Sequence, residues 1–166
     1  MLTTLRSTFV RALLLLSTAT ASAATLNVGP GQIYTTIQSA INAAANGDTV
    51  LVAPGTYFEN LMIDGKEITL RSTAGAATTI IDGAQRGIVL TIEHTTSLAT
   101  TVDGFTIRNG NSNYTPSDAG IYLGEAGATL QNNVFTGNFG YDINATLSSI
   151  HATNNQISTV VPVSQA

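Results

Sequence analysis

The sequence has no cysteine, no tryptophan and few charges, and these absences exclude several classes of protein. Without cysteine, the chain is not a disulfide-stapled scaffold. Only 10% of the 166 residues are charged, against a usual fraction of about 25%, which excludes a Lys- and Glu-rich heptad coiled coil. Six basic and ten acidic residues give a net charge of −4, so we expect no nucleic-acid partner, because its phosphates would be repelled. The length suits a single domain.

Residues 1–23 have the three-part pattern of a signal peptide. Arg6 and Arg11 precede the apolar run 12–16, and small residues then lead to the cleavage motif at 21–23. The run is too short to cross a bilayer, so we expect a chain that is not membrane-spanning. A buried N-terminal helix is the alternative. Export without cysteine favours a secreted protein or one of the bacterial periplasm or cell envelope.

Residues 24–47 contain a stretch with the period of an α-helix. An apolar stripe recurs at positions i, i+3, i+4 and i+7, formed by Ile37, Ala40, Ile41 and Ala44. Thr35 followed by Gln38 predicts a capping box at the start of this helix, and Asn46-Gly47 predicts its end. We therefore expect a short amphipathic helix ahead of the main fold.

From residue 48 to residue 166 the hydrophobic period changes to two. Short β-rich runs are bounded by turns that contain Gly, Asp or Asn; these runs are 49–52, 57–63, 67–70, 78–81, 88–92 and 100–107. Short strands separated by such turns predict an all-β chain.

Two repeated motifs favour one all-β architecture. The motif around Asp82 recurs around Asp103, and the pair Asn132-Asn133 recurs as Asn154-Asn155 after nearly the same interval. A step of this size suits a coil of short strands that returns above itself. We expect a right-handed parallel β-helix of about five to six coils over residues 48–166; an antiparallel sandwich is the alternative.

The coil geometry assigns structural roles to two groups of residues. Apolar side chains that point inward would stack on like residues in the coils above and below; these are Val50, Val52, Ile63, Ile68, Leu70, Ile81, Leu90, Phe105, Ile107, Leu130 and Phe135. Asn133 and Asn155 are expected to form a ladder that bonds the backbone of neighbouring coils.

Several segments resemble the pectate-lyase-like β-helix superfamily. Segments 34–41, 47–50, 54–60 and 79–83 are similar to its opening, in which a helix caps the N-terminal end of the solenoid. Segments 103–110, 119–122 and 132–138 resemble the Gly- and Asn-rich repeats of bacterial surface β-helix proteins. The resemblance covers residues 33–158 and implies the fold. It says little about function, because one fold hosts many kinds of site.

Asp82 and Asp103 are the candidate metal ligands. If they lie one coil apart on the same edge, their carboxylates would repel unless they share a cation such as Ca2+. The superfamily resemblance implies a Ca2+-dependent polyuronate lyase as one possible activity, with Lys66, Arg86 or Arg108 as the base. The alternative is structural, because each Asp precedes a Gly in a turn and can bond its own backbone.

The sequence lacks the residues that other activities of the superfamily require. Segment 55–59 resembles the first motif of pectin methylesterases, but their Gln-Asp and Arg-Pro-Trp segments have no counterpart. His94, His151 and Met62 lack the spacing of copper or zinc ligands. Asp118 and Asp142 are candidates for the paired acids of a glycoside hydrolase, but only by residue type.

A glycan-binding surface requires fewer special residues. Aromatic rings, amides and a few charges suffice to hold a sugar, and they gather in or beside segment 111–118, which breaks the coil length; we select Arg108, Asn109, Asn111, Tyr114 and Tyr122. Tyr122 is equally compatible with an inward position.

These residues favour an exported, non-catalytic β-helix whose partner is a polysaccharide or a cell-surface glycan. The last coil would leave a parallel edge open, which predicts either self-association through that coil or a chain that is a shortened relative of a longer solenoid.

Overall fold

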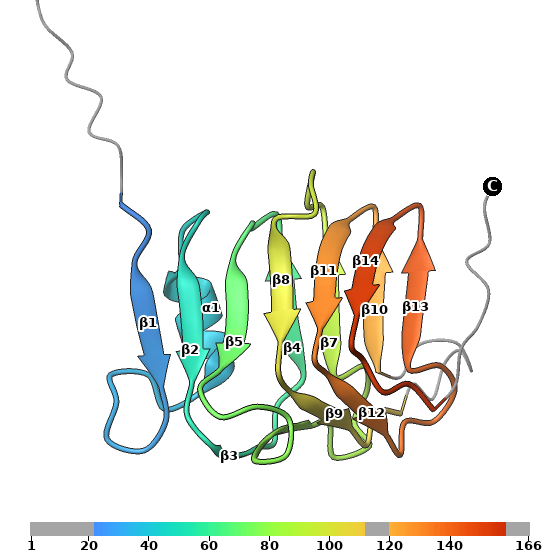
Figure 1. Cartoon of the computed structure of the whole chain (residues 1–166), viewed down its shortest axis with the longest axis horizontal. Coiled ribbons are helices and arrows are strands. Elements are labelled where there is room, and N and C mark those ends of the chain that lie inside the picture. Colours follow the sequence, from blue (N-terminus) through green and yellow to red (C-terminus); the bar gives the residue numbers. More distant parts are fainter. Residues whose placement is uncertain (1–21, 112–119, 159–166) are drawn as a thin grey trace, which may run out of the picture.

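The chain winds as a parallel β-helix, the architecture expected from its repeats. A computed structural model describes residues 22–111 and 120–158. Every strand pairing among the described residues is parallel, and three sheets form the walls of the solenoid (Figure 1). The antiparallel sandwich is therefore excluded. Residues 1–21 lie outside the described residues, so the signal peptide stays a prediction.

Each coil contributes a strand to every sheet, apart from the first and the last. Sheet A contains β1 (Thr25–Val28), β2 (Thr49–Val52), β5 (Thr69–Ser72), β8 (Thr100–Asp103), β11 (Gly127–Gln131) and β14 (Ser149–Thr153). Sheet B contains β3 (Gly55–Tyr57), β6 (Thr79–Asp82), β9 (Thr106–Arg108) and β12 (Val134–Thr136). Sheet C contains β4 (Leu61–Asp64), β7 (Leu90–Glu93), β10 (Ile121–Gly124) and β13 (Ile143–Thr146). β1 already pairs with β2, so the solenoid begins before residue 48.

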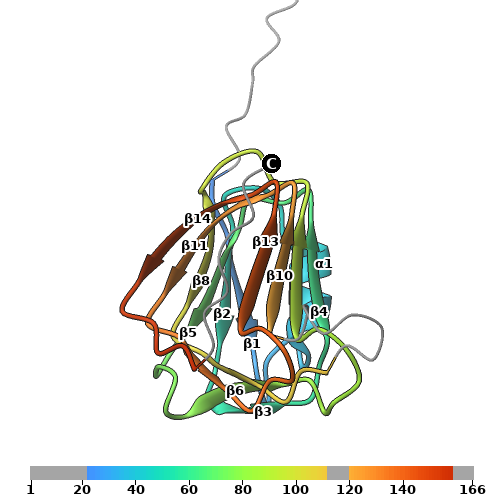
Figure 2. The same cartoon turned by 90° about the vertical axis from the view of Figure 1, so that its right-hand side faces the viewer.

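The helix α1 (Ile37–Ala43) takes the place of a sheet C strand in the first coil. It packs beside β4 at the N-terminal end of the sheet (Figure 2). The expected capping box is wrong by one residue, because Thr36 is the N-cap and accepts from the Ser39 N–H. Two further N–H groups of the first turn donate to the carboxylate of Glu59, at 2.8 and 3.0 Å. A carboxylate at a helix N-terminus is favoured by the helix dipole.

Lys66 supports the other end of α1. Its ammonium group donates to the carbonyl oxygens of Ile41, Asn42 and Ala44 at 2.8–2.9 Å. These carbonyls have no partner within the helix, and a cation is favoured there. Lys66 is thus a capping residue for α1.

The inward side chains form one continuous core. All eleven apolar residues expected to point inward are buried, from Val50 at one end to Phe135 near the other. The expected asparagine ladder is confirmed as well: Asn133 donates to Val102 O and to Asn155 Oδ1, while Asn155 donates to Leu130 O. No helix in the described part of the chain is long and apolar enough to cross a bilayer.

The coils differ in length in more places than segment 111–118, where the sequence indicated a longer coil. In sheet A, the Cα partners run from Thr25 through Thr49, Thr69, Thr101 and Thr129 to His151. The coil from Thr49 to Thr69 is the shortest of these, and the coil from Thr69 to Thr101 is the longest. The longer coils carry extra residues in the loops between sheets, so the constant coil length that the repeated motifs suggested is wrong in the middle of the solenoid.

Candidate functional site

Asp82 and Asp103 do not lie above one another. Asp82 ends β6 in sheet B and is the Cα partner of Arg108, whereas Asp103 ends β8 in sheet A and is the partner of Arg71. The expectation that they are vertical neighbours is corrected here, because it assumed that the interval between the two motifs is one full coil. The recurring motif reflects similar turn chemistry on two different sheets.

Each of these carboxylates is held by an arginine. Asp103 binds Arg71 at 3.1 Å and Asp82 binds Arg108 at 2.8 Å. In residues 22–111 and 120–158, no group of three or more His, Asp and Glu side chains is arranged to hold a metal. Lys66 caps α1 and Arg108 is paired with Asp82, so two of the three candidate lyase bases already have structural partners.

The buried carboxylate of Asp82 organises the corner that follows β6. It accepts hydrogen bonds from Arg108 Nε, from Asn109 Nδ2 and from the Ala84 N–H at 2.8–2.9 Å. Burial by itself would raise the pKa of Asp82, but these hydrogen bonds and the Arg108 charge outweigh it and hold the pKa below its usual range. Two of the expected glycan-binding residues, Arg108 and Asn109, thus hold this corner together.

The other expected glycan-binding residues lie in different places. Asn111 is half-buried and forms an isolated bridge with Phe139. Tyr122 lies in β10, on the outer face of sheet C, so an inward position is excluded. Tyr114 and Asp118 lie outside the described residues. Asp142 is buried and accepts hydrogen bonds from Asn138 and Ser158, which marks it as structural.

The ring of Tyr122 lies over Gly124 on the outer face of sheet C. A methyl group at Gly124 would come within 3.0–3.2 Å of the ring and the hydroxyl, so the ring covers the glycine. The neighbouring strands place Thr91 and Asn144 on either side of it in register. A flat aromatic ring on a sheet surface offers a face on which a ligand can stack.

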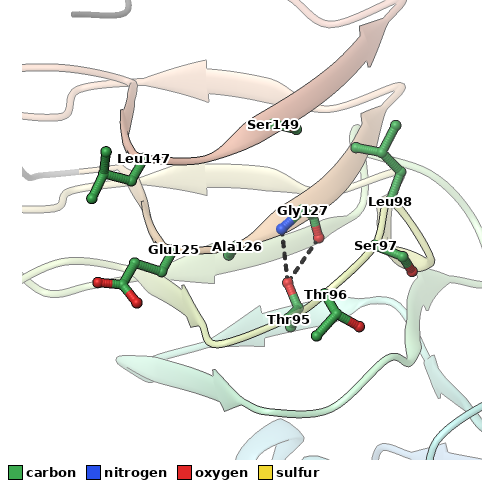
Figure 3. Close-up of a pocket in the computed structure, with 9 residues that line it drawn as sticks. All are labelled: Thr95, Thr96, Ser97, Leu98, Glu125, Ala126, Gly127, Leu147 and Ser149. Carbon is green, nitrogen blue, oxygen red and sulfur yellow. Dashed lines mark hydrogen bonds between the residues drawn. The ribbon is translucent and has the colours of Figure 1, made fainter. Parts of the chain in front are cut away.

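Two hollows that share Glu125 and Leu147 together form a surface groove, which leads from Tyr122 round the corner from sheet C to sheet A. We call it the Tyr122 groove; its first part, of about 160 Å³, is lined by Glu93, His94, Tyr122, Gly124, Glu125, Thr146 and Leu147. Its second part, of about 340 Å³, shares Glu125 and Leu147 with the first and adds Thr95, Thr96, Ser97, Leu98, Ala126, Gly127 and Ser149 (Figure 3). The groove therefore combines one aromatic ring with hydroxyls and carboxylates.

The floor of the Tyr122 groove is firmly held. The Thr95 hydroxyl donates to Gly127 O and accepts from Gly127 N, both at 2.9 Å (Figure 3). Any side chain at Gly127 would collide with the backbone of Ser97. The residue after each sheet C strand has a positive φ; these residues are Gly65, His94, Glu125 and Leu147. These residues occupy the same corner in successive coils, and for this reason His94 and Glu125 line the groove together.

The Tyr122 groove is acidic. His94 Nδ1 lies 2.7 Å from Asp64 Oδ1, and this hydrogen bond raises the pKa of His94. The negative charges of Asp64, Glu93 and Glu125 raise it further. Glu93 and Glu125 line the groove with His94, so its lining carries more carboxylates than imidazoles.

The parallel sheets, the asparagine ladder and the helical cap define a right-handed parallel β-helix of the pectate-lyase-like superfamily. The chain belongs to the family described as a protein of unknown function (DUF1565), whose profile matches residues 64–164.

The chain is also similar to a bacterial protein in sequence and to a solved structure in fold. The chain is 36% identical over 141 residues to the probable ABC transporter binding protein NosD of Pseudomonas aeruginosa. The match covers 83% of this chain but 29% of that relative. The crystal structure of pectin methylesterase from Aspergillus niger, in deglycosylated form, superimposes with a TM-score of 0.52 and 17% identity. That match covers 81% of this chain and 56% of the esterase, and it shows the fold.

Proposed function

We propose that this chain is an exported, non-catalytic binding module that holds a polysaccharide or surface glycan in the Tyr122 groove. The half-buried ring of Tyr122, which lies over Gly124 and lines the groove, is the observation that favours this function most. Sugar rings stack their C–H faces on aromatic side chains, and their hydroxyls bind nearby carboxylates and hydroxyls. The groove offers both kinds of contact.

The charge of the groove narrows the class of glycan. Glu93 and Glu125 accept hydrogen bonds from sugar hydroxyls or from an amine, whereas they repel the carboxylates of a polyuronate. The ligand of the Tyr122 groove is therefore a neutral or amine-bearing sugar chain. This charge also argues against the polyuronate lyase, as do the separation of Asp82 from Asp103 and the structural partners of Lys66 and Arg108.

The relative supports binding as the type of function. NosD of Pseudomonas aeruginosa is described as a probable binding protein of an ABC transporter. A binding role for this chain agrees with its signal-peptide pattern, which supports a location in the periplasm, in the cell envelope or outside the cell. The chain spans 29% of that relative's length, so only the type of function is carried over.

Isothermal titration against three hexasaccharides tests this function: one neutral, one of glucosamine and one of galacturonate. We expect the chain to bind the neutral or the glucosamine chain and to bind galacturonate more weakly in this groove. Tyr122→Ala should weaken binding about tenfold, because it removes the stacking face. Gly124→Ala should also weaken it, because the added methyl group displaces the ring.

The control is Phe58→Ala, which removes an exposed aromatic ring that does not line this groove. Equal affinity of Tyr122→Ala and the wild-type chain would contradict the proposal, and so would the absence of binding to both the neutral and the glucosamine chain. Release of unsaturated product from polygalacturonate in the presence of Ca2+ would establish the lyase instead.

A further inference from the structure

The hydrogen bonds of the solenoid begin at Ala24, one residue before β1. The Ala24 N–H donates to Asp48 Oδ1 at 2.7 Å, and the Ala24 carbonyl oxygen accepts from the Thr49 N–H at 2.8 Å. Ser22 and Ala23 are exposed, and no hydrogen bond joins them to the rest of the described chain. The first residue that the fold holds is therefore the residue that follows the predicted cleavage motif at 21–23.

Asp48, which accepts the Ala24 N–H, is itself held between two further segments of the chain. The residue is 7% exposed, and its Oδ2 accepts from the Ala45 N–H at 2.8 Å. Its own N–H donates to Ala45 O at 3.1 Å, and its carbonyl oxygen accepts from the Thr69 N–H at 2.9 Å. Hydrogen bonds from Ala24 and Ala45 hold the pKa of Asp48 below its usual range, so the carboxylate is charged at neutral pH.

The Asp48 carboxylate lacks a cationic partner within residues 22–111 and 120–158. The ion pairs of this part of the chain join three other aspartates to an arginine or a histidine. Lys66 binds the carbonyl oxygen of Ala44, close to this site, but its three hydrogen bonds all go to carbonyl oxygens. Buried carboxylates are stabilised by a paired positive charge. In the uncleaved chain, however, the donors to Asp48 are uncharged N–H groups.

We propose that Asp48 is the binding site for the α-ammonium group of the mature chain, which a signal peptidase creates by hydrolysing the bond between Ala23 and Ala24. Water adds to the Ala23 carbonyl carbon and the C–N bond breaks. Ala23 leaves as a carboxylate, and both hydrogens of the water end on the Ala24 nitrogen. This nitrogen already lies 2.7 Å from Asp48 Oδ1, so the hydrogen bond becomes an ion pair in place.

Cleavage at this bond thus stabilises the folded chain, whereas an ammonium group one or two residues away would not reach Asp48. The proposal rests on the signal-peptide pattern and on the contacts of Ala24 and Asp48. It does not depend on the ligand of the Tyr122 groove.

Export of the intact chain from a bacterial host tests the proposal. Mass spectrometry of the exported protein should show a chain that begins at Ala24. A comparison chain carries Gly-Ser inserted between residues 23 and 24, so cleavage after Ala23 leaves the ammonium group two residues away and the Ala24 N–H remains an amide. In urea unfolding, this insertion should raise the unfolding equilibrium constant about fivefold, because a neutral donor replaces a charged one.

Asp48→Asn shows whether this carboxylate causes the difference. An amide oxygen still accepts a hydrogen bond but carries no charge, so in Asp48→Asn the insertion should change the constant by less than about twofold. Asp103→Asn is the matched control: it removes a carboxylate that pairs with Arg71, and the insertion should keep its full effect there.

The pH dependence tests the same ion pair with Asp48 intact. Pairing with a carboxylate should raise the pKa of the α-amino group above its ordinary value of about 8. Its contribution to stability is then complete below that pH and is lost as the pH rises through the raised, folded-state pKa. The exported chain and the insertion chain should therefore converge in alkaline solution. Lys66 and Glu67 occur in both chains, so their titration cancels in the difference.

Four results would overturn the proposal. They are an exported chain that begins at another residue, an insertion without effect on stability, an equal effect of the insertion in the wild-type chain and in Asp48→Asn, and a difference between the two chains that persists through the alkaline range.

Discussion

Asp82→Ala is expected to lower the free energy of unfolding by about 3 kcal/mol. The Asp82 side chain is 4% exposed, and it binds a guanidinium, a side-chain amide and a backbone N–H. Its removal leaves these donors without their acceptor, at a cost of about 1–3 kcal/mol for each donor that stays buried. The Arg108 side chain is 36% exposed and retains access to water, so we expect the lower end of the range for a broken buried ion pair.

Urea unfolding of matched variants measures this effect. Asp103→Ala is the control, because the Arg71–Asp103 pair is more exposed and such pairs contribute up to about 1 kcal/mol. The slope with urea should be unchanged, so the difference appears as a shift of the midpoint. A midpoint for Asp82→Ala that equals that of Asp103→Ala would contradict the role of the buried carboxylate.

The same carboxylate makes stability depend on pH. The pKa of Asp82 is lowered in the folded chain, so its contribution is fully present above the pKa of an unfolded Asp, about 3.9. The contribution is lost as the pH falls through the lowered, folded-state pKa. The stability difference between the wild-type chain and Asp82→Asn should therefore shrink in this acid range.

Asn133→Ala is expected to destabilise the chain by about 3 kcal/mol. The side chain is fully buried; its oxygen accepts from the Phe105 N–H at 3.0 Å, and its amide donates to Val102 O at 2.9 Å. Alanine leaves both of these backbone groups unpaired inside the solenoid and leaves a cavity as well. Thermal or urea unfolding measures the loss.

Asn154→Ala is the matched control for the asparagine ladder. Asn154 is exposed, and its amide makes one long hydrogen bond of 3.4 Å to Asn132. Asn154 has a φ of 54°, which Asn tolerates better than Ala, so we expect a loss of about 1 kcal/mol, well below that of Asn133→Ala. An equal loss in both variants would mean that the buried ladder contributes no more than a surface contact.

Much of the fold could be predicted because local chemistry determines it. The expected strand 49–52 coincides with β2, and the inward residues follow from alternation along each strand. The asparagine ladder was predictable because buried Asn side chains satisfy the backbone at coil corners. Pairing between coils was not predictable, because loops of different length separate the strands.

The uneven coils also explain which site residues were missed. Five threonines align in sheet A, from Thr25 to Thr129, although no fixed step relates them. His94 and Glu125 meet for the same reason, since each follows a sheet C strand of a different coil. Asn111 and Tyr122, which the sequence predicted to share one glycan-binding surface, line different hollows.

Engineered disulfides test the register of the coils most directly, because the chain has no cysteine of its own. Thr69 and Thr101 are Cα partners in neighbouring strands of sheet A, within the range that a disulfide spans. In Thr69→Cys/Thr101→Cys, mild oxidation should give an intramolecular disulfide, detected by mass spectrometry and by loss of free thiol. In Ile80→Cys/Thr101→Cys, the cysteines are as far apart in the sequence as Asp82 and Asp103 but lie on different sheets, so both thiols should stay free. A disulfide in the second variant, or free thiols in the first, would contradict the register of the coils on which the account depends.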